Sequence, residues 1–205
     1  MINSTDIHLV GVLFFSMSGT ILGVKTRLDL FGISFVACVG ALGGGTLRDI
    51  LIGHYPLCWV ENPKYIIAVL IGVASSLLFR NRLAAIKNLI FILDSIGIGF
   101  FMTSGVNICI DAGINPFISL VFGVLSVIVG GLLRDIICNE VPIILKRELV
   151  ATASFAGGLM MLAGQFLGLY PIMCNILGVV TVITIRLLGS KYNWKIPEVG
   201  LNDGK

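Results

Sequence analysis

Two arginine–aspartate pairs stand inside strongly apolar stretches of the chain. Arg48 and Asp49 lie in the segment GGGTLRDI, and Arg134 and Asp135 lie in the segment VGGLLRDI. Ionisable groups within a membrane span cost at least about 2.5 kcal/mol each and usually face a bundle interior or water. Such pairs can line a path for ions, or they can form an architectural ion-pair network between helices.

Neighbouring residues point about 100° apart on a helix, so the arginine and aspartate of each pair are not expected to share one partner. We expect the arginines to bind carbonyls or a carboxylate on another segment. One aspartate is then expected to face an aqueous path. Which of the four charges would contact an ion stays open at this point.

Glycines directly precede both pairs, at Gly43, Gly44 and Gly45 and again at Gly130 and Gly131. Glycine costs roughly 0.8–1 kcal/mol against alanine inside a helix, so both helices are expected to kink. Carbonyls freed by a kink are tolerated only where they face protein or a water-filled cavity, and there they can coordinate a cation. The alternative is close helix packing, which glycine-rich faces also permit. The repetition of the glycines before both pairs favours a pore.

The composition shows what kind of element positions these residues. The chain of 205 residues is 57% hydrophobic and 12% charged, with a mean hydropathy of +1.02. A soluble domain of this length would need far more charged surface, so residues 1–205 are predicted to form one all-α integral membrane domain. Because a spanning helix needs about 20 apolar residues, seven transmembrane helices fit. We predict them at residues 7–24, 30–53, 64–79, 89–110, 116–138, 149–168 and 171–188.

An internal repeat relates the two motifs at a constant offset of 86 positions (134 minus 48). The same offset places Ser18 on Ser104 and Pro56 on Pro142, without a gap. The copies are predicted at residues 7–79 and 89–168, and the seventh helix, 171–188, has no counterpart. Each copy contains three spans, so the second copy enters the membrane inverted relative to the first, as in many transport proteins.

Further polar residues are weaker candidates for the same path. Ser18 and Ser104 occupy equivalent positions and are expected against the glycine-containing helices, although hydroxyls in membrane helices often bond local carbonyls. Asp94 begins the fourth span, where it is expected either at a cytoplasmic mouth that gathers cations or at the interface. With two histidines and five scattered cysteines, neither a zinc nor a haem site is expected, nor any other cofactor. The only metal ions expected are permeant K⁺ or Na⁺ near the glycine carbonyls.

The basic residues predict the orientation, because lysine and arginine mark cytoplasmic loops. They place the N-terminus outside and a tail at residues 189–205 in the cytoplasm. No basic cluster indicates nucleic-acid binding. The residues on the predicted cytoplasmic side are Lys25, Arg27, Arg80, Arg82, Lys87, Lys146, Arg147, Arg186, Lys191, Lys195 and Lys205.

The two copies of GG-x-LRD-I, in the second and fifth of seven spans, resemble the trimeric intracellular cation (TRIC) channels, specifically their short prokaryotic relatives with a tandem "glycine transporter" domain. The resemblance covers about residues 7–188. It implies a homotrimer in the inner membrane of a prokaryote, surrounded by lipid, with a potassium-favouring pore in every subunit. It also implies that the kinked second and fifth helices line that pore. This chain departs from the doubled pattern at Val129, where the first copy has Gly43.

The leading hypothesis is therefore a passive channel for monovalent cations. A secondary transporter of a small solute such as glycine is the alternative, since inverted repeats with broken helices also describe carriers. An enzyme is not expected, because the sequence has no Ser/His or His/carboxylate constellation of the kind that catalysis uses.

Overall fold

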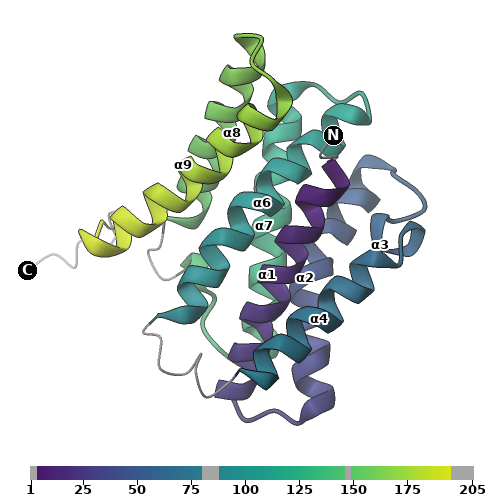
Figure 1. The fold of residues 1–205 in the computed structure, drawn as a ribbon, viewed down its shortest axis with the longest axis vertical. Coiled ribbons are helices and arrows are strands. Elements are labelled where there is room, and N and C mark those ends of the chain that lie inside the picture. The colour runs from purple at the N-terminus through teal and green to yellow at the C-terminus, as the bar shows by residue number, and fades with distance from the viewer. Residues whose placement is uncertain (1–3, 80–87, 146–148, 195–205) are drawn as a thin grey trace, which may run out of the picture.

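The computed structural model describes residues 4–79, 88–145 and 149–194. Every regular element within them is helical (Figure 1). The basic residues 80, 82, 87, 146, 147, 195 and 205, which contribute to the predicted orientation, lie outside the described residues. The elements are α1 (Ser4–Lys25), α2 (Leu30–Ile52), α3 (Cys58–Glu61), α4 (Lys64–Leu78), α6 (Leu89–Asp111), α7 (Pro116–Ile137), the 3₁₀ turn η1 (Ile143–Leu145), α8 (Val150–Phe166) and α9 (Pro171–Lys191).

Five of the described helices are long and apolar enough to cross a membrane by length and composition: α1, α2, α6, α7 and α9. The other two predicted spans correspond to the shorter apolar helices α4 and α8, with 15 and 17 residues. At 1.5 Å per residue these are about 22 and 26 Å long, less than the roughly 30 Å of a hydrocarbon core. The all-helical membrane class is confirmed, while the count of seven spans stays a prediction.

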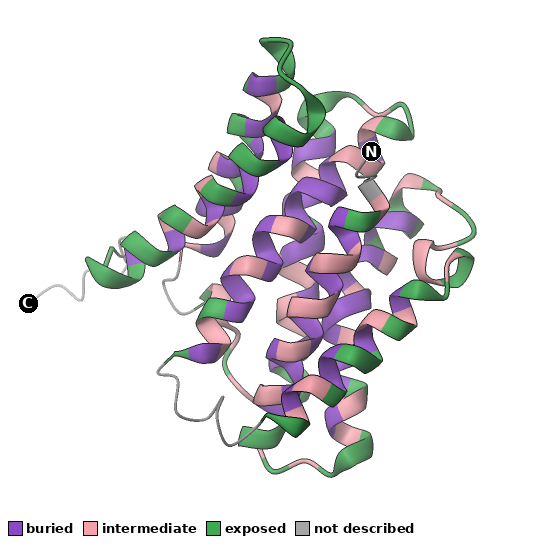
Figure 2. Ribbon diagram, in the orientation of Figure 1, coloured by how far each residue is buried: buried purple, intermediate pink, exposed green. Residues whose placement is uncertain are grey.

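The helices pack in pairs that reflect the sequence repeat. Helix α1 packs against α6 and α2 against α7, so equivalent helices of the two copies meet each other. Helix α9 packs on α8 and α6, on the opposite side of the bundle from α4 (Figure 1). Buried positions concentrate on α6 and α1, where 72% and 61% of the most apolar window is buried, against 39% for α7 and α9 (Figure 2). Helices α1 and α6 therefore form the centre of the bundle.

The repeated glycines lie where α2 crosses α7. Both helices continue through their glycines as single helices, so the kinks predicted there do not divide either helix. A Cβ atom added at Gly44 would overlap the carbonyl oxygen of Ser126, and one added at Gly130 would lie 2.7 Å from the carbonyl oxygen of Gly40. The absence of a side chain thus lets the two backbones touch, which is the packing alternative considered from the sequence.

We therefore predict opposite outcomes for two glycine substitutions. Gly44→Ala should lower the melting temperature of the purified protein, because one of two tightly packed helices must move to admit the methyl group. Gly131→Ala should leave stability unchanged or raise it by up to about 1 kcal/mol, because a Cβ there has nothing within 4 Å and alanine is the better helix former. Thermal unfolding in detergent measures both. Equal losses in the two variants would contradict a packing role specific to the crossing.

Candidate functional site

The arginine and aspartate of each repeated motif bond to each other. Arg134 Nε and Nη2 lie 2.9 and 2.8 Å from Asp135 Oδ1. Arg48 Nε and Nη2 lie 3.0 and 2.7 Å from Asp49 Oδ1. The bond within each pair was not predicted from the sequence, which indicated only that each residue would have its own contact. The arginine side chain is long enough to fold back around the helix and to present its planar donors to the adjacent carboxylate.

The second oxygen of each aspartate holds the segment that follows its helix. Asp135 Oδ2 accepts a hydrogen bond from the backbone N–H of Ile143 at 2.8 Å, where η1 begins. Asp49 Oδ2 accepts one from the backbone N–H of Cys58 at 2.9 Å, where α3 begins. Charge-assisted bonds of this kind are roughly twice as strong as neutral ones. Both aspartates are 1–2% exposed, so in this structure they act as architectural anchors.

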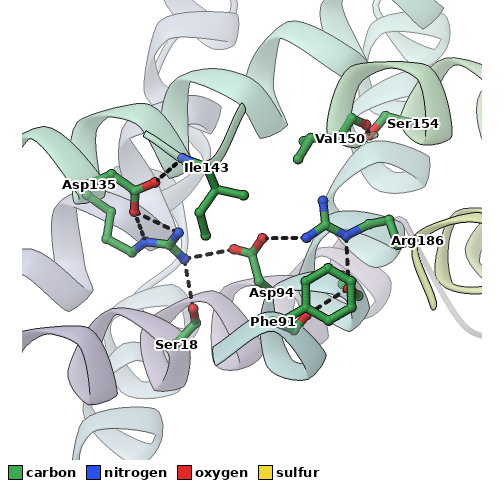
Figure 3. Close-up of polar contacts among 10 residues, drawn as sticks. Ser18, Phe91, Asp94, Asp135, Ile143, Val150, Ser154 and Arg186 are labelled. Atoms are coloured by element: carbon green, nitrogen blue, oxygen red, sulfur yellow. Dashed lines mark hydrogen bonds and ion pairs between the residues drawn. The ribbon is translucent and has the colours of Figure 1, made fainter. Parts of the chain in front are cut away.

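Arg134 also connects three helices of the bundle. Its Nη1 donates to Asp94 Oδ1 on α6 and to Ser18 Oγ on α1, each at 2.7 Å (Figure 3). The expectation that a motif arginine binds a carboxylate on another span is confirmed for Arg134. Ser18, predicted to lie against the glycine-containing helices, is one of its partners.

Asp94 extends this network to the helix that has no counterpart in the repeat. Its Oδ2 lies 3.2 Å from Arg186 Nη2, on α9 (Figure 3). Arg186 Nε donates to Ser95 Oγ at 2.8 Å, and its guanidinium lies 4.8 Å from the centre of the Phe91 ring. Asp94 is 3% exposed, with an arginine on each oxygen. Asp94 is thus buried in an ion-pair network, and its predicted position at a cytoplasmic mouth or at the interface stays a prediction.

Two arginines and two aspartates therefore balance one another in this buried cluster, which we call the Arg134 network. Removing one partner from a buried ion pair leaves an uncompensated charge and typically costs about 3–5 kcal/mol. The network joins α1, α6, α7, η1 and α9, so it determines how these elements fit together. Its members are Ser18, Asp94, Ser95, Arg134, Asp135, the backbone of Ile143 and Arg186.

Arg48 has fewer partners than its repeat counterpart. The position equivalent to Asp94 in the first copy is His8 (94 minus 86), whose ring bonds to the hydroxyl of Tyr65 at 3.0 Å instead. Ser104, equivalent to Ser18, bonds the carbonyl of Phe101 in its own helix. Among the residues that the structure describes, Arg48 Nη1 is buried without a hydrogen-bond partner. The two copies thus share the motif, but the polar contacts around Arg48 differ from those around Arg134.

Two small cavities, of about 20 and 10 Å³, lie beside the two motifs. Each is about large enough for one water molecule. Each cavity is lined by the aspartate and one glycine of the motif beside it, and by an aromatic ring from the other copy. Repeat-equivalent residues therefore line the two cavities. Among the shared lining positions, larger cavity first, are Asp94 and His8, Gly131 and Gly45, Asp135 and Asp49, and Phe15 and Phe101.

Two aromatic rings in contact with each other each line one of these cavities. Phe15 on α1 lines one cavity and Phe101 on α6 lines the other. The rings meet edge to face with centroids 5.4 Å apart, and the two residues are 1% and 2% exposed. The sequence analysis did not select either residue. Their signal was available, because the two phenylalanines stand at the same repeat offset as the motifs.

A larger cavity of about 490 Å³ opens beside the first motif. Cys58 and Tyr65 line both this outer cavity and the small cavity next to Asp49, so the two spaces adjoin. Two acidic residues, Glu61 and Asp111, also face the outer cavity. An entrance with carboxylates attracts cations by long-range electrostatics. The lining of the outer cavity is Thr5, His54, Cys58, Glu61, Asn62, Tyr65, Ile108, Asp111 and Ala112.

Three side chains that could bind a metal ion lie together near the C-terminus of α2. One ligand atom each from Asp49, His54 and Cys58 lie within 4.8 Å of one another. No metal site was expected from the two histidines and five scattered cysteines, because the cysteines form no CxxC pair. The spacing D-x₄-H-x₃-C directly after a predicted helix end is the signal that could have found the cluster.

Comparison with known sequences places this architecture among membrane proteins. A family model described as "Glycine transporter" matches twice, over residues 7–81 and 91–166. The UPF0126 inner membrane protein YadS of Escherichia coli strain K12 is 32% identical over 199 residues, covering 96% of each chain. A UPF0126 membrane protein of Deinococcus radiodurans is 36% identical over 195 residues, covering 93% of this chain and 89% of that one.

Solved structures with the same fold are cation channels. The TRIC trimeric intracellular cation channel orthologue from Rhodobacter sphaeroides superposes with a TM-score of 0.86 at 26% identity, covering 94% of this chain and 100% of that one. A prokaryotic TRIC channel crystallised in 0.5 M KCl superposes with a TM-score of 0.83 at 26% identity, covering 94% and 98%. The all-helical membrane fold expected from the resemblance therefore has solved structural counterparts.

Proposed function

Because the chain belongs to the glycine transporter family, is similar to YadS of Escherichia coli and shares its fold with TRIC channels, we propose that it is a passive channel for monovalent cations, potassium in preference. The fold similarity supports cation conduction. The potassium preference and the residues along the path are our proposals.

The proposed path follows the cavities in order. A cation enters the outer cavity, passes Asp49 into the first small cavity, crosses between Phe15 and Phe101, and leaves through the second small cavity beside Asp135. The observation that carries this proposal is the pair of repeat-equivalent cavities on either side of the two rings. Hydrophobic constrictions gate channels by excluding water, so the structure corresponds to a closed path.

The charges along this path suit a cation. Arg48 and Arg134 are each bonded to the neighbouring aspartate, so neither presents an isolated positive charge to the cavities. Glu61 and Asp111 add negative charge at the outer entrance. Beyond these groups the candidate ligands are the hydroxyls and carbonyls near Gly45 and Gly131, so we expect only modest selectivity between K⁺ and Na⁺.

The assembly and orientation are part of the same proposal. We propose a homotrimer in a bacterial inner membrane, by analogy with the trimeric channel from Rhodobacter sphaeroides and the inner membrane protein from Escherichia coli. The N-terminus and the outer cavity then face outward, because Lys25 and Lys191 end their helices at the opposite side.

A carrier of a small solute such as glycine is the second candidate. The family description and the inverted repeat favour it, since alternating access also uses equivalent half-sites on either side of a central barrier. The two small cavities are, however, too small for an amino acid in this structure.

Recordings from the purified protein in a planar bilayer separate the two candidates. We expect discrete unitary currents whose reversal potential follows the potassium gradient, with a smaller contribution from sodium. Bilayers prepared with protein-free detergent provide the control. Saturable glycine uptake into proteoliposomes without unitary currents would overturn the channel proposal in favour of the carrier.

A further inference from the structure

We propose that Asp49, His54 and Cys58 form a binding site for a thiophilic divalent cation of the zinc class. The site lies where the outer cavity meets the first motif, and it exists in only one of the two repeats. It is independent of whether the chain conducts ions.

The backbone around the C-terminus of α2 brings the three side chains together. Gly53, with φ of 70°, ends the helix in the left-handed conformation. The chain then turns back, and the N–H of His54 bonds the carbonyl of Asp49 at 2.8 Å. The N–H of Cys58 bonds the carboxylate of Asp49 at 2.9 Å. The backbone N–H groups of His54 and Cys58 therefore both bond to Asp49, and these bonds hold the two residues near Asp49 without a bound ion.

The side-chain atoms are close to the separation that a metal requires. Tetrahedral zinc, with ligands at about 2.0–2.3 Å, separates its ligand atoms by roughly 3.3–3.8 Å. The three atoms here lie within 4.8 Å of one another, so small side-chain rotations would complete the geometry. Carboxylate, imidazole and thiolate are all zinc ligands, and a three-residue site leaves a fourth position for water from the outer cavity.

An unsatisfied atom points independently to a ligand. His54 Nδ1 is buried, and the described residues offer it no hydrogen-bond partner. Buried polar atoms are seldom left unpaired, because a missing hydrogen bond costs about 1–3 kcal/mol. A coordinated cation would satisfy this nitrogen.

The local charges accommodate a cation despite the nearby arginine. Arg48 Nη2 lies 3.7 Å from Cys58 Sγ and neutralises part of the charge of Asp49. Glu61 and Asp111 face the same cavity and offset that positive charge. Burial and then the charge of Asp49 raise the pKa of the Cys58 thiol to about 12. The thiol therefore holds its proton until a metal displaces it, which is the usual route by which cysteine becomes a ligand.

The second repeat provides an internal control. The positions equivalent to the three ligands are Asp135, Glu140 and Ile144 (49, 54 and 58 plus 86), which supply neither an imidazole nor a thiol. A thiophilic ion should therefore bind once per subunit, beside the first motif only.

Cadmium titration of the purified full-length protein tests the site, since a cadmium–thiolate bond gives an ultraviolet charge-transfer band. We expect the band to saturate at one ion per subunit, and zinc to abolish it by competition. His54→Ala should weaken binding about 100-fold, and Cys58→Ser should remove the band. Cys38→Ser, which alters a partly buried cysteine elsewhere, should leave both unchanged.

A second measurement covers the case in which a variant folds poorly. Zinc should raise the melting temperature of the unmodified protein, because it binds the folded state, and EDTA should reverse that shift. A band that persists in Cys58→Ser, or a melting temperature that zinc does not raise, would overturn the proposal. Neither measurement involves ion flux, so the channel proposal can fail or stand separately.

Discussion

Arg134→Ala should destabilise the protein more than any other single charge removal in the motifs, by about 3–5 kcal/mol. Arg134 holds Asp135 within its own helix and Asp94 on α6, and both carboxylates would lose a buried cationic partner. Ser18 on α1 would lose its bond at the same time. We expect a much smaller folded fraction after extraction in mild detergent, measured by size-exclusion chromatography, and a lower melting temperature of what remains.

Arg48→Ala is the matched comparison, because Arg48 occupies the equivalent position in the first copy. Within the described ranges its carboxylate partner is Asp49 alone, with a weak contact to Cys58, so the loss of stability should be clearly smaller. Lys191→Ala, at an exposed cation on α9, should change stability by no more than about 0.5 kcal/mol. Equal losses for Arg48→Ala and Arg134→Ala would contradict the asymmetry of the two networks.

Phe101→Ala should increase cation flux, because the ring forms half of the barrier between the two small cavities. A decrease of only about 1.4 kcal/mol in the barrier raises a rate about tenfold. The same substitution removes a buried aromatic ring and should cost about 3–5 kcal/mol of stability, so flux must be normalised to folded protein. Potassium-driven flux in proteoliposomes measures the effect, and Phe15→Ala should act in the same direction.

Phe117→Ala is the control for ring removal, since Phe117 is 55% exposed at the start of α7, away from both small cavities. Its flux should match that of the unmodified protein. Folded Phe101→Ala and Phe15→Ala variants with unchanged flux would show that the rings do not block the path, and would move the proposed constriction elsewhere.

The sequence predicted the elements well because each depends on local composition. Apolar runs of helical length predict membrane spans, because a backbone surrounded by lipid must satisfy its hydrogen bonds within its own helix. The bounds of α2 and α7 agree with the predicted spans to within one residue. The shorter α4 and α8 also begin and end close to the predicted positions, although their length alone does not establish that they cross the membrane.

The partners of the charged residues were less accessible to sequence reasoning. The helical angle between neighbours predicted a separate partner for each residue and did not predict the Arg134–Asp135 pair, which the long, flexible arginine side chain makes possible. Arg186 could not be linked to Asp94, because it belongs to a helix outside the repeat and bonds across 92 positions. The contact between Phe15 and Phe101 was not predicted, because the repeat marks the two residues as equivalent without showing that their helices bring the rings together.

The sequence by itself determined that the chain is helical, that it belongs in a membrane, and that its two copies carry the same motif at one offset. Only the tertiary structure decided what each motif residue does. The repeated glycines form the contact between α2 and α7, and Arg134 and Arg48 have different hydrogen-bond partners. The reason is physical: hydropathy acts along a helix, whereas a buried ion pair depends on which side chain another helix presents at that point. At equivalent positions α6 presents Asp94 and α1 presents His8.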